Sequence, residues 1–314
     1  MLGRTANSLF WMFRNLERAE NTARLLDAGL RMALTRDVAT AEAEWRSVLQ
    51  TAGHSAAYDA KFDEVTGQQA WNFILRDKEN RSSVMVMMDN VRTNARASRN
   101  SISGELWAVV NESWMEIKDL LSRPVSQGQL GNVLAAIRRA GTLAHGAVGS
   151  TMLRDQGFHF ARAGTFVERG DSTARLLDIK YYLLLPSLSY VGSSLDTGQW
   201  ENVLRSVAGD RAFGWIHAGQ IESRSIVEFL VLDDRFPRSL AFCHNALREE
   251  LMALARIHKH EGECNELMRQ ADMRLTDLTA DAIFEQGLHQ FLTEFMQTNT
   301  QIAKAIGEDY RFLA

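Results

Sequence analysis

Residues 16–27 read LERAENTARLLD and residues 167–178 read VERGDSTARLLD, so one polar and apolar pattern occurs twice in the same chain. Eight of the twelve positions are identical at a single offset, including the Glu-Arg pair at the second and third positions. At the fifth position the acidic residues Glu20 and Asp171 correspond. This degree of identity within one chain indicates an internal duplication.

The similarity continues downstream of these two segments. Trp45 and Phe73 of the first half have counterparts in Trp200 and Phe229 of the second, with a small drift in offset that indicates short loop insertions. A repeat of about 155 residues is far longer than the period of a solenoid. We therefore predict one compact multi-helix domain over residues 1–314, built from two pseudo-twofold related repeats.

These pseudo-repeats are expected at about residues 1–155 and 156–314. In the first, apolar residues recur at three- and four-residue steps, as expected for one face of a long helix. They are Leu9, Met12, Leu16, Ala19, Ala23, Leu26 and Leu30. The chain has only 3 prolines and no sustained alternation of apolar and polar residues, which predicts an all-α fold.

A second long helix is predicted at about 157–185, followed by a loop near 186–198. Other helices are predicted at roughly 39–52, 55–66, 68–77, 81–101, 103–122, 127–150, 199–208, 212–232, 237–260, 263–282 and 284–306.

Composition excludes several classes of protein. Hydrophobic residues make up 46% of the chain, which is enough to form a core and excludes a disordered chain. The 35 basic and 39 acidic residues give a net charge of -4, without the basic excess of a nucleic-acid-binding protein.

The compartment is predicted from the cysteines and from the apolar runs. The 2 cysteines do not form a disulfide framework, which favours a reducing compartment. The N-terminus has no signal-peptide pattern, and the apolar run at 181–185 stops at Pro186, well short of the roughly 20 residues that cross a bilayer. We expect a soluble, cytoplasmic protein that does not enter a membrane.

The duplicated segments also carry a polar stripe. Helical spacing brings Arg14, Glu17, Glu20 and Arg24 to one side of the first long helix, and the second copy repeats the pattern. If the two long helices cross near the pseudo-axis, the stripes meet. The predicted polar cluster comprises Glu17, Arg18, Glu20, Arg24, Glu168, Arg169, Asp171 and Arg175.

Two interpretations of this cluster remain open. One is structural: an exposed i,i+4 pair such as Glu20 and Arg24 contributes only about 0.2–0.5 kcal/mol, and a buried network locks helices together. The other is a site in which forked guanidinium groups bind the carboxylate of a peptide.

Motifs for catalysis or for metals are weak. No histidine follows a glutamate by three residues, and Walker-type and GxSxG motifs are absent from the sequence. His258, His260 and Cys264 lie close together in sequence with Glu261 and Glu263, but a polar helix end explains them better than a metal site. No metal or cofactor is therefore expected, and no catalytic residue is assigned.

Three segments resemble a known family. They are MLGRTANSLFWMFRNLERAENTARLLD at residues 1–27, RTNAR at residues 92–96 and FVERGDSTARLLD at residues 166–178. Through them the chain resembles, over essentially its whole length, the bacterial alpha-E family, an all-α domain named for a Glu-Arg motif. The motif positions are Glu17-Arg18 and, in the second half, Glu168-Arg169.

The sequence departs from the family pattern at one point. Family members often have Asn-Pro before the serine that starts the central helix. Here Asn80-Arg81 precede Ser82-Ser83, while Pro237 is present in the second half. This departure affects only the expected cap of that helix.

The resemblance also implies partners. Members of this family are typically encoded beside, or fused to, a circularly permuted ATP-grasp-type ligase, often with a transglutaminase-like cysteine peptidase. The expected function is thus a non-catalytic accessory subunit of an ATP-dependent amide- or peptide-bond-forming system, in which the partner carries out the ATP chemistry. The alternatives are a stand-alone enzyme with Glu17 or Glu168 as general base, and a helical adaptor unrelated to ligation. Self-association is left open.

Overall fold

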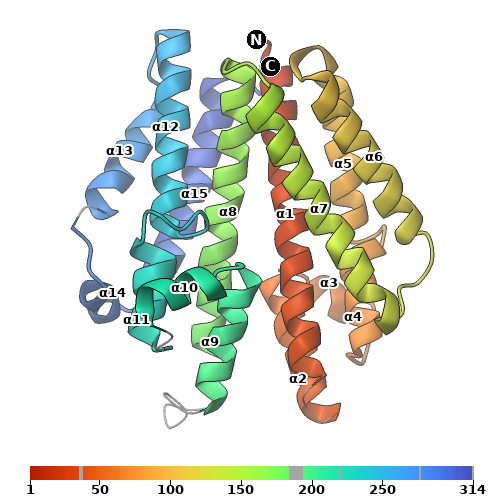
Figure 1. Cartoon of the computed structure of the whole chain (residues 1–314). Helices are drawn as coiled ribbons and strands as arrows, with labels where there is room; N and C mark the ends of the chain where they lie inside the picture. The colour runs from red at the N-terminus through yellow and green to blue at the C-terminus, as the bar shows by residue number, and fades with distance from the viewer. Residues whose placement is uncertain (35–37, 184–193, 219–220, 276, 313–314) are drawn as a thin grey trace. The chain divides into compact units, whose positions relative to one another are not determined.

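The computed structural model describes residues 1–34, 38–183, 194–218, 221–275 and 277–312 of the chain (Figure 1). Within these ranges the regular secondary structure is helical and contains no β-strand, which confirms the predicted all-α fold. None of the described helices is both long enough and apolar enough to cross a membrane.

The chain forms two compact units. The N-terminal unit comprises residues 11–153, and the C-terminal unit comprises residues 1–10 together with residues 154–314. The boundary falls inside the first helix, α1 (Gly3–Ala33), so α1 contributes its first turns to one unit and the rest to the other. The pseudo-twofold relation between the two repeats stays a prediction.

The N-terminal unit contains the rest of α1 and a series of shorter helices. They are α2 (Val38–Thr51), α3 (Ser55–Asp59), α4 (Gly67–Arg76), α5 (Val84–Ala97), the 3-10 turn η1 (Arg99–Ser101), α6 (Gly104–Leu120) and α7 (Gln127–Thr151). Helix α6 packs against both α5 and α7, and α4 packs against α2 and α5 (Figure 1).

Serine and threonine caps explain where several of these helices begin. The backbone N–H of Val86 donates to the Ser83 hydroxyl at the start of α5. The Asn80 side chain supports this cap, because it accepts from the backbone of Ser82 and donates to the carbonyl of Phe73. The cap therefore forms with Asn80-Arg81 in place of Asn-Pro.

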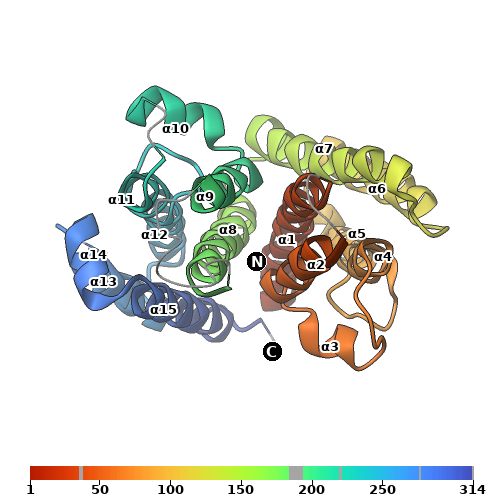
Figure 2. The same ribbon diagram turned by 90° about the horizontal axis from the view of Figure 1, so that it is seen from below.

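In the C-terminal unit, α8 (Gln156–Leu183) packs against α12 (Leu240–His258) and α15 (Leu288–Asp309). Figures 1 and 2 both show these three helices side by side. The remaining elements are α9 (Ser194–Ser206), α10 (Asp210–His217), α11 (Ser223–Val227), the π-helical turn η3 (Glu228–Leu232), α13 (Glu263–Leu275) and α14 (Ala280–Gln286). Ser239 caps α12 as Ser83 caps α5.

Some predicted helices differ from those observed. The helix predicted at 212–232 is interrupted, because α10 ends where Ala218 adopts a left-handed conformation with φ 50°. The helix predicted at 263–282 is split between α13 and α14, and Asp277 in the break has φ 58°. Left-handed residues terminate a right-handed helix, and here neither left-handed position is the glycine that is usual there, although Gly219 directly follows Ala218 in the sequence.

Two other boundaries also differ. The helix predicted at 55–66 ends early, because α3 stops at Asp59. Most of the loop predicted near 186–198 lies outside the described residues, and α9 already begins at Ser194.

Gly164 on α8 allows the first turns of α1 to lie close to it within the C-terminal unit. A Cβ atom at this position would lie 2.2 Å from the carbonyl oxygen of Phe10. The neighbouring atoms are backbone, which cannot rotate away, so only glycine fits at this contact.

We predict that Gly164→Ala destabilises the protein by about 1–3 kcal/mol, because overpacking forces α1 and α8 apart. Urea unfolding followed by circular dichroism measures the change. Gly131→Ala on α7 is the matched control: no atom lies within 4 Å of the added Cβ, so it should leave stability unchanged or raise it by up to about 1 kcal/mol. Equal effects of the two substitutions would contradict the close-packing argument.

Candidate functional site

The first copy of the Glu-Arg motif places two carboxylates inside the N-terminal unit. The side chain of Glu17 is fully buried, and Glu20, one turn further along α1, is 3% exposed. Their neighbours Leu16, Ala19 and Ala23 are also buried. Burying a carboxylate costs several kcal/mol unless other groups compensate for its lost hydration, so the neighbouring polar groups are important here.

Glu20 forms the predicted pair with Arg24. The Nε and Nη2 atoms of Arg24 both donate to Oε1 of Glu20, at 3.1 and 2.7 Å. The other oxygen, Oε2, faces α7 at Gly141, where an added Cβ would lie only 2.2 Å from it. Glycine at this position gives the carboxylate of Glu20 the space it occupies.

His145 on α7 completes the arrangement around Glu17. Its Nε2 lies 3.1 Å from Oε2 of Glu17, and its ring packs against Phe13 with centroids 5.7 Å apart. One ligand atom from each of Glu17, Glu20 and His145 lies within 4.8 Å of the other two. The sequence analysis missed His145, because it lies 128 positions from Glu17 in a helix with no motif of its own.

Arg18 influences His54, which lies outside the group formed by Glu17, Glu20 and His145. Burial, with a smaller contribution from the positive charge of Arg18, lowers the pKa of His54 to about 4. His54 precedes α3, and its ring meets Phe73 edge-on at 6.1 Å. The folded chain therefore keeps His54 neutral at pH values where an exposed histidine is protonated.

We predict a loss of stability on acidification that depends on His54. Between pH 6.5 and 4 the unfolded chain binds a proton at His54 that the folded chain does not, so stability falls as the pH falls through this window. The loss from this histidine reaches about 3 kcal/mol at the acid end. His54→Gln should remove most of it, measured as urea unfolding at pH 7 and at pH 4.5.

His260→Gln, which changes an exposed histidine, is the control for this experiment. If the pH dependence of His54→Gln matched that of the unmodified chain, the burial argument for His54 would be wrong.

The second copy of the motif lies in the C-terminal unit. Glu168 is 3% exposed, and Nε of Arg175 donates to Oδ2 of Asp171 at 2.7 Å, which repeats the pairing of Glu20 with Arg24. Arg169 donates to the carbonyl of Pro237 at 3.4 Å, and Thr173 donates to the carbonyl of Arg238. This copy thus anchors the segment that leads into α12.

The structure accordingly places the predicted residues in two groups. Glu17 and Glu20 come together with His145 and Arg24 in the N-terminal unit, and Arg18 lies near His54. Glu168, Arg169, Asp171 and Arg175 of the second copy lie in the C-terminal unit. The predicted meeting of the two stripes stays a prediction.

The duplicated aspartates have partners that differ between the copies. Asp27 pairs with Arg31 and with Arg138 of α7, at 3.3 and 3.4 Å. Asp178 instead contacts Nδ1 of His289 on α15 at 2.5 Å. Both contacts join a long helix to a neighbouring helix, which agrees with a packing role.

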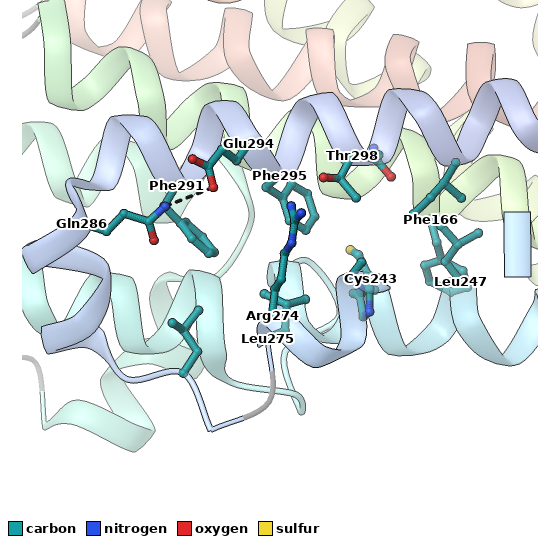
Figure 3. A pocket seen from close by; sticks show the side chains of 15 residues that line it. Phe166, Cys243, Leu247, Arg274, Leu275, Gln286, Phe291, Glu294, Phe295 and Thr298 are labelled. Carbon is teal, nitrogen blue, oxygen red and sulfur yellow. Dashed lines mark hydrogen bonds between the residues drawn. The ribbon is translucent and has the colours of Figure 1, made fainter. Parts of the chain in front are cut away.

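A cavity of about 260 Å³ lies in the C-terminal unit (Figure 3). Figure 3 shows Cys243 and Leu247 from α12 and Glu294 and Thr298 from α15 around it, with Gln286 hydrogen-bonded to Glu294 at 3.1 Å. Most of its lining is apolar, which suits a small apolar group. No sequence motif marks this cavity.

His244 closes part of this cavity. Its Nε2 contacts Oδ1 of Asp272 at 2.5 Å, and Arg248 contacts the other oxygen of Asp272 at 3.3 Å. Burial lowers the pKa of His244, although Asp272 acts in the opposite direction. The wall of the cavity is therefore fixed by a hydrogen-bonded network.

The sequence patch around His258 has a structural explanation. His258 ends α12, and Cys264 lies in the first turn of α13, where its backbone N–H donates to Asp309 at 2.8 Å. Burial raises the pKa of the Cys264 thiol, which makes it a poor ligand and a poor nucleophile. In the part of the chain that the structure describes, the group able to hold a metal is formed by Glu17, Glu20 and His145, away from this patch.

Comparison with known proteins gives a family but no activity. Residues 1–311 match the Alpha-E family, described as a predicted alpha-helical domain with a conserved ER motif. The chain is similar to uncharacterized protein Mb2597 of Mycobacterium bovis and to uncharacterized proteins MT2643 and Rv2567 of Mycobacterium tuberculosis. Each is 26% identical over 335 residues, a match that covers 96% of this chain and 37% of the relative. The chain thus spans just over a third of the length of these relatives. No solved structure matches it.

Proposed function

This chain belongs to the Alpha-E family, and on that premise we propose that it is an accessory helical subunit of an ATP-dependent amide- or peptide-bond-forming ligase system. Its proposed main partner is a circularly permuted ATP-grasp-type protein. A transglutaminase-like cysteine peptidase is proposed as a second partner. The matched region makes up 37% of the length of the relatives. This fraction is compatible with fusion of a domain like this one to further domains in those proteins. A cytoplasmic location is part of this proposal.

The observation that carries the proposal is an exposed apolar patch on α10. Trp215 is 83% exposed and its neighbour Ile216 is 43% exposed. Tryptophan is enriched among the residues that contribute most to the affinity of protein interfaces, and leaving such a side chain in water is unfavourable. A partner that covers α10 would bury this patch.

Burial of the motif carboxylates favours the accessory role over a stand-alone enzyme. A general base must reach the proton that it removes, whereas Glu17 is fully buried and Glu168 is 3% exposed. We propose that the polar cluster holds the long helices in the conformation that the partner recognises. Binding of a peptide carboxylate by Arg18 or Arg169 remains part of the proposal.

We predict that Trp215→Ala weakens binding of the co-expressed ATP-grasp-type partner by at least about tenfold, because it removes the side chain expected to fill a pocket of the partner. Affinity capture of the tagged chain from its native cell identifies the partner, and titration of the purified proteins measures the affinity.

Leu153→Ala is the matched control, because Leu153 is 79% exposed but lies in the loop between α7 and α8. Full binding by both variants would reject the α10 patch as the interface. Recovery of the chain without an ATP-grasp protein would instead favour the unrelated adaptor.

We also predict that Glu17→Ala and Arg18→Ala lower product formation by the assembled ligase, because each alters the cluster inside the N-terminal unit. Product is measured at saturating ATP. Arg139→Ala is the control, because Arg139 is exposed and pairs with the exposed Glu116 in the same unit. If both variants fold normally and support full ligase activity, the cluster has no role in the reaction.

A further inference from the structure

We propose that Glu17, Glu20 and His145 bind one divalent transition-metal ion inside the N-terminal unit. This inference does not rest on the ligase partnership, because it concerns the chain alone. It also revises the sequence-based expectation that no metal site is present, which rested on the missing Glu-x-x-His pattern and on the polar patch around His258 and His260.

The donor set is mixed and comes from two helices. Two carboxylates lie one turn apart on α1, and an imidazole on α7 faces them, with the three ligand atoms within 4.8 Å of one another. Ligands about 2.1 Å from one ion at right angles lie about 3 Å apart. The separation of 3.1 Å between His145 Nε2 and Glu17 Oε2 matches that value.

The surroundings of the Glu17 and Glu20 carboxylates favour the binding of a cation. Glu17 and Glu20 are buried side by side, so their negative charges interact through a medium of low dielectric. Arg24 donates hydrogen bonds from Nε and Nη2 to Oε1 of Glu20, and Oε2 of that carboxylate is directed toward α7. A divalent ion between the helices would compensate charge on both carboxylates at once.

The surroundings hold the donors in place before an ion binds. The ring of Phe13 packs on the ring of His145, and Gly141 leaves room for the carboxylate of Glu20. Such outer contacts fix the orientation of metal ligands and raise affinity.

The site also has a route to solvent. The side chain of His145 is 27% exposed, whereas that of Glu17 is not exposed at all. An ion can therefore enter beside the imidazole. Three protein ligands leave further coordination positions, which water or a carboxylate oxygen of a bound molecule would fill.

The chemistry of the donors selects the class of metal. Carboxylates alone suit Mg²⁺ and Ca²⁺, but an imidazole nitrogen favours Mn²⁺, Fe²⁺ and Zn²⁺. We therefore assign the site to a first-row transition ion and expect Mg²⁺ to compete poorly.

The test uses the chelator-treated full chain and added Mn²⁺, with free Mn²⁺ followed by electron paramagnetic resonance. We expect one Mn²⁺ per chain, displaced by Zn²⁺ and not by equimolar Mg²⁺. Glu17→Gln and His145→Ala should each weaken Mn²⁺ binding by at least tenfold. Glu168→Gln is the matched control, because it removes the buried carboxylate of the second motif copy, and it should bind Mn²⁺ like the unmodified chain.

A second measurement covers the case in which Glu17→Gln fails to fold. His145→Ala removes a partly exposed side chain and should keep the fold. Mn²⁺ should raise the melting temperature of the unmodified chain and of Glu168→Gln but not that of His145→Ala. Absence of stoichiometric binding, or equal binding by all variants, would overturn the metal site. Either result leaves the proposed interface at Trp215 unaffected, so the two proposals fail separately.

Discussion

Desolvation of the carboxylates on α1 is the constraint on which packing in the N-terminal unit depends. Glu17 and Glu20 are buried on a helix whose other faces are largely apolar, and each buried ion costs several kcal/mol in lost hydration. Arg24 pairs with Glu20 from the same helix, and His145 of α7 contacts Glu17. The position of α7 against α1 is thus tied to a polar contact as well as to the apolar core.

The packing of α1 also requires close contacts with glycines of two other helices. At Gly141 the carboxylate of Glu20 occupies the space of a side chain on α7, and at Gly164 a carbonyl of α1 does the same on α8. Both glycines lie inside helices, where this residue weakens the helix by about 1 kcal/mol relative to alanine. The packing that they permit offsets this local cost.

Local patterns in the sequence predicted the all-α fold, the long helices and the pairing of Glu20 with Arg24, because each depends on residues a few positions apart. The contact of Glu17 with His145 joins residues 128 positions apart, and nothing in the sequence around His145 indicates it. The breaks at Ala218 and Asp277 were also missed, since neither left-handed position is itself a glycine, although Gly219 next to Ala218 was a signal for the first break. The cavity beside Cys243 is lined by residues of five helices, α8, α12, α13, α14 and α15, so predicting it requires their placement in space.

The two motif copies share some contacts and differ in others. Both copies keep a buried motif glutamate and an acidic residue paired with an arginine four positions later, which is the chemistry of the long helix itself. The contact with a neighbouring helix differs: Asp27 pairs with Arg138, whereas Asp178 contacts His289. In the described ranges, an imidazole joins two buried carboxylates only in the first copy. If this contact served only to hold a long helix in place, we would expect it in both motif copies. The histidine of the first copy is therefore the feature that the fold alone does not explain.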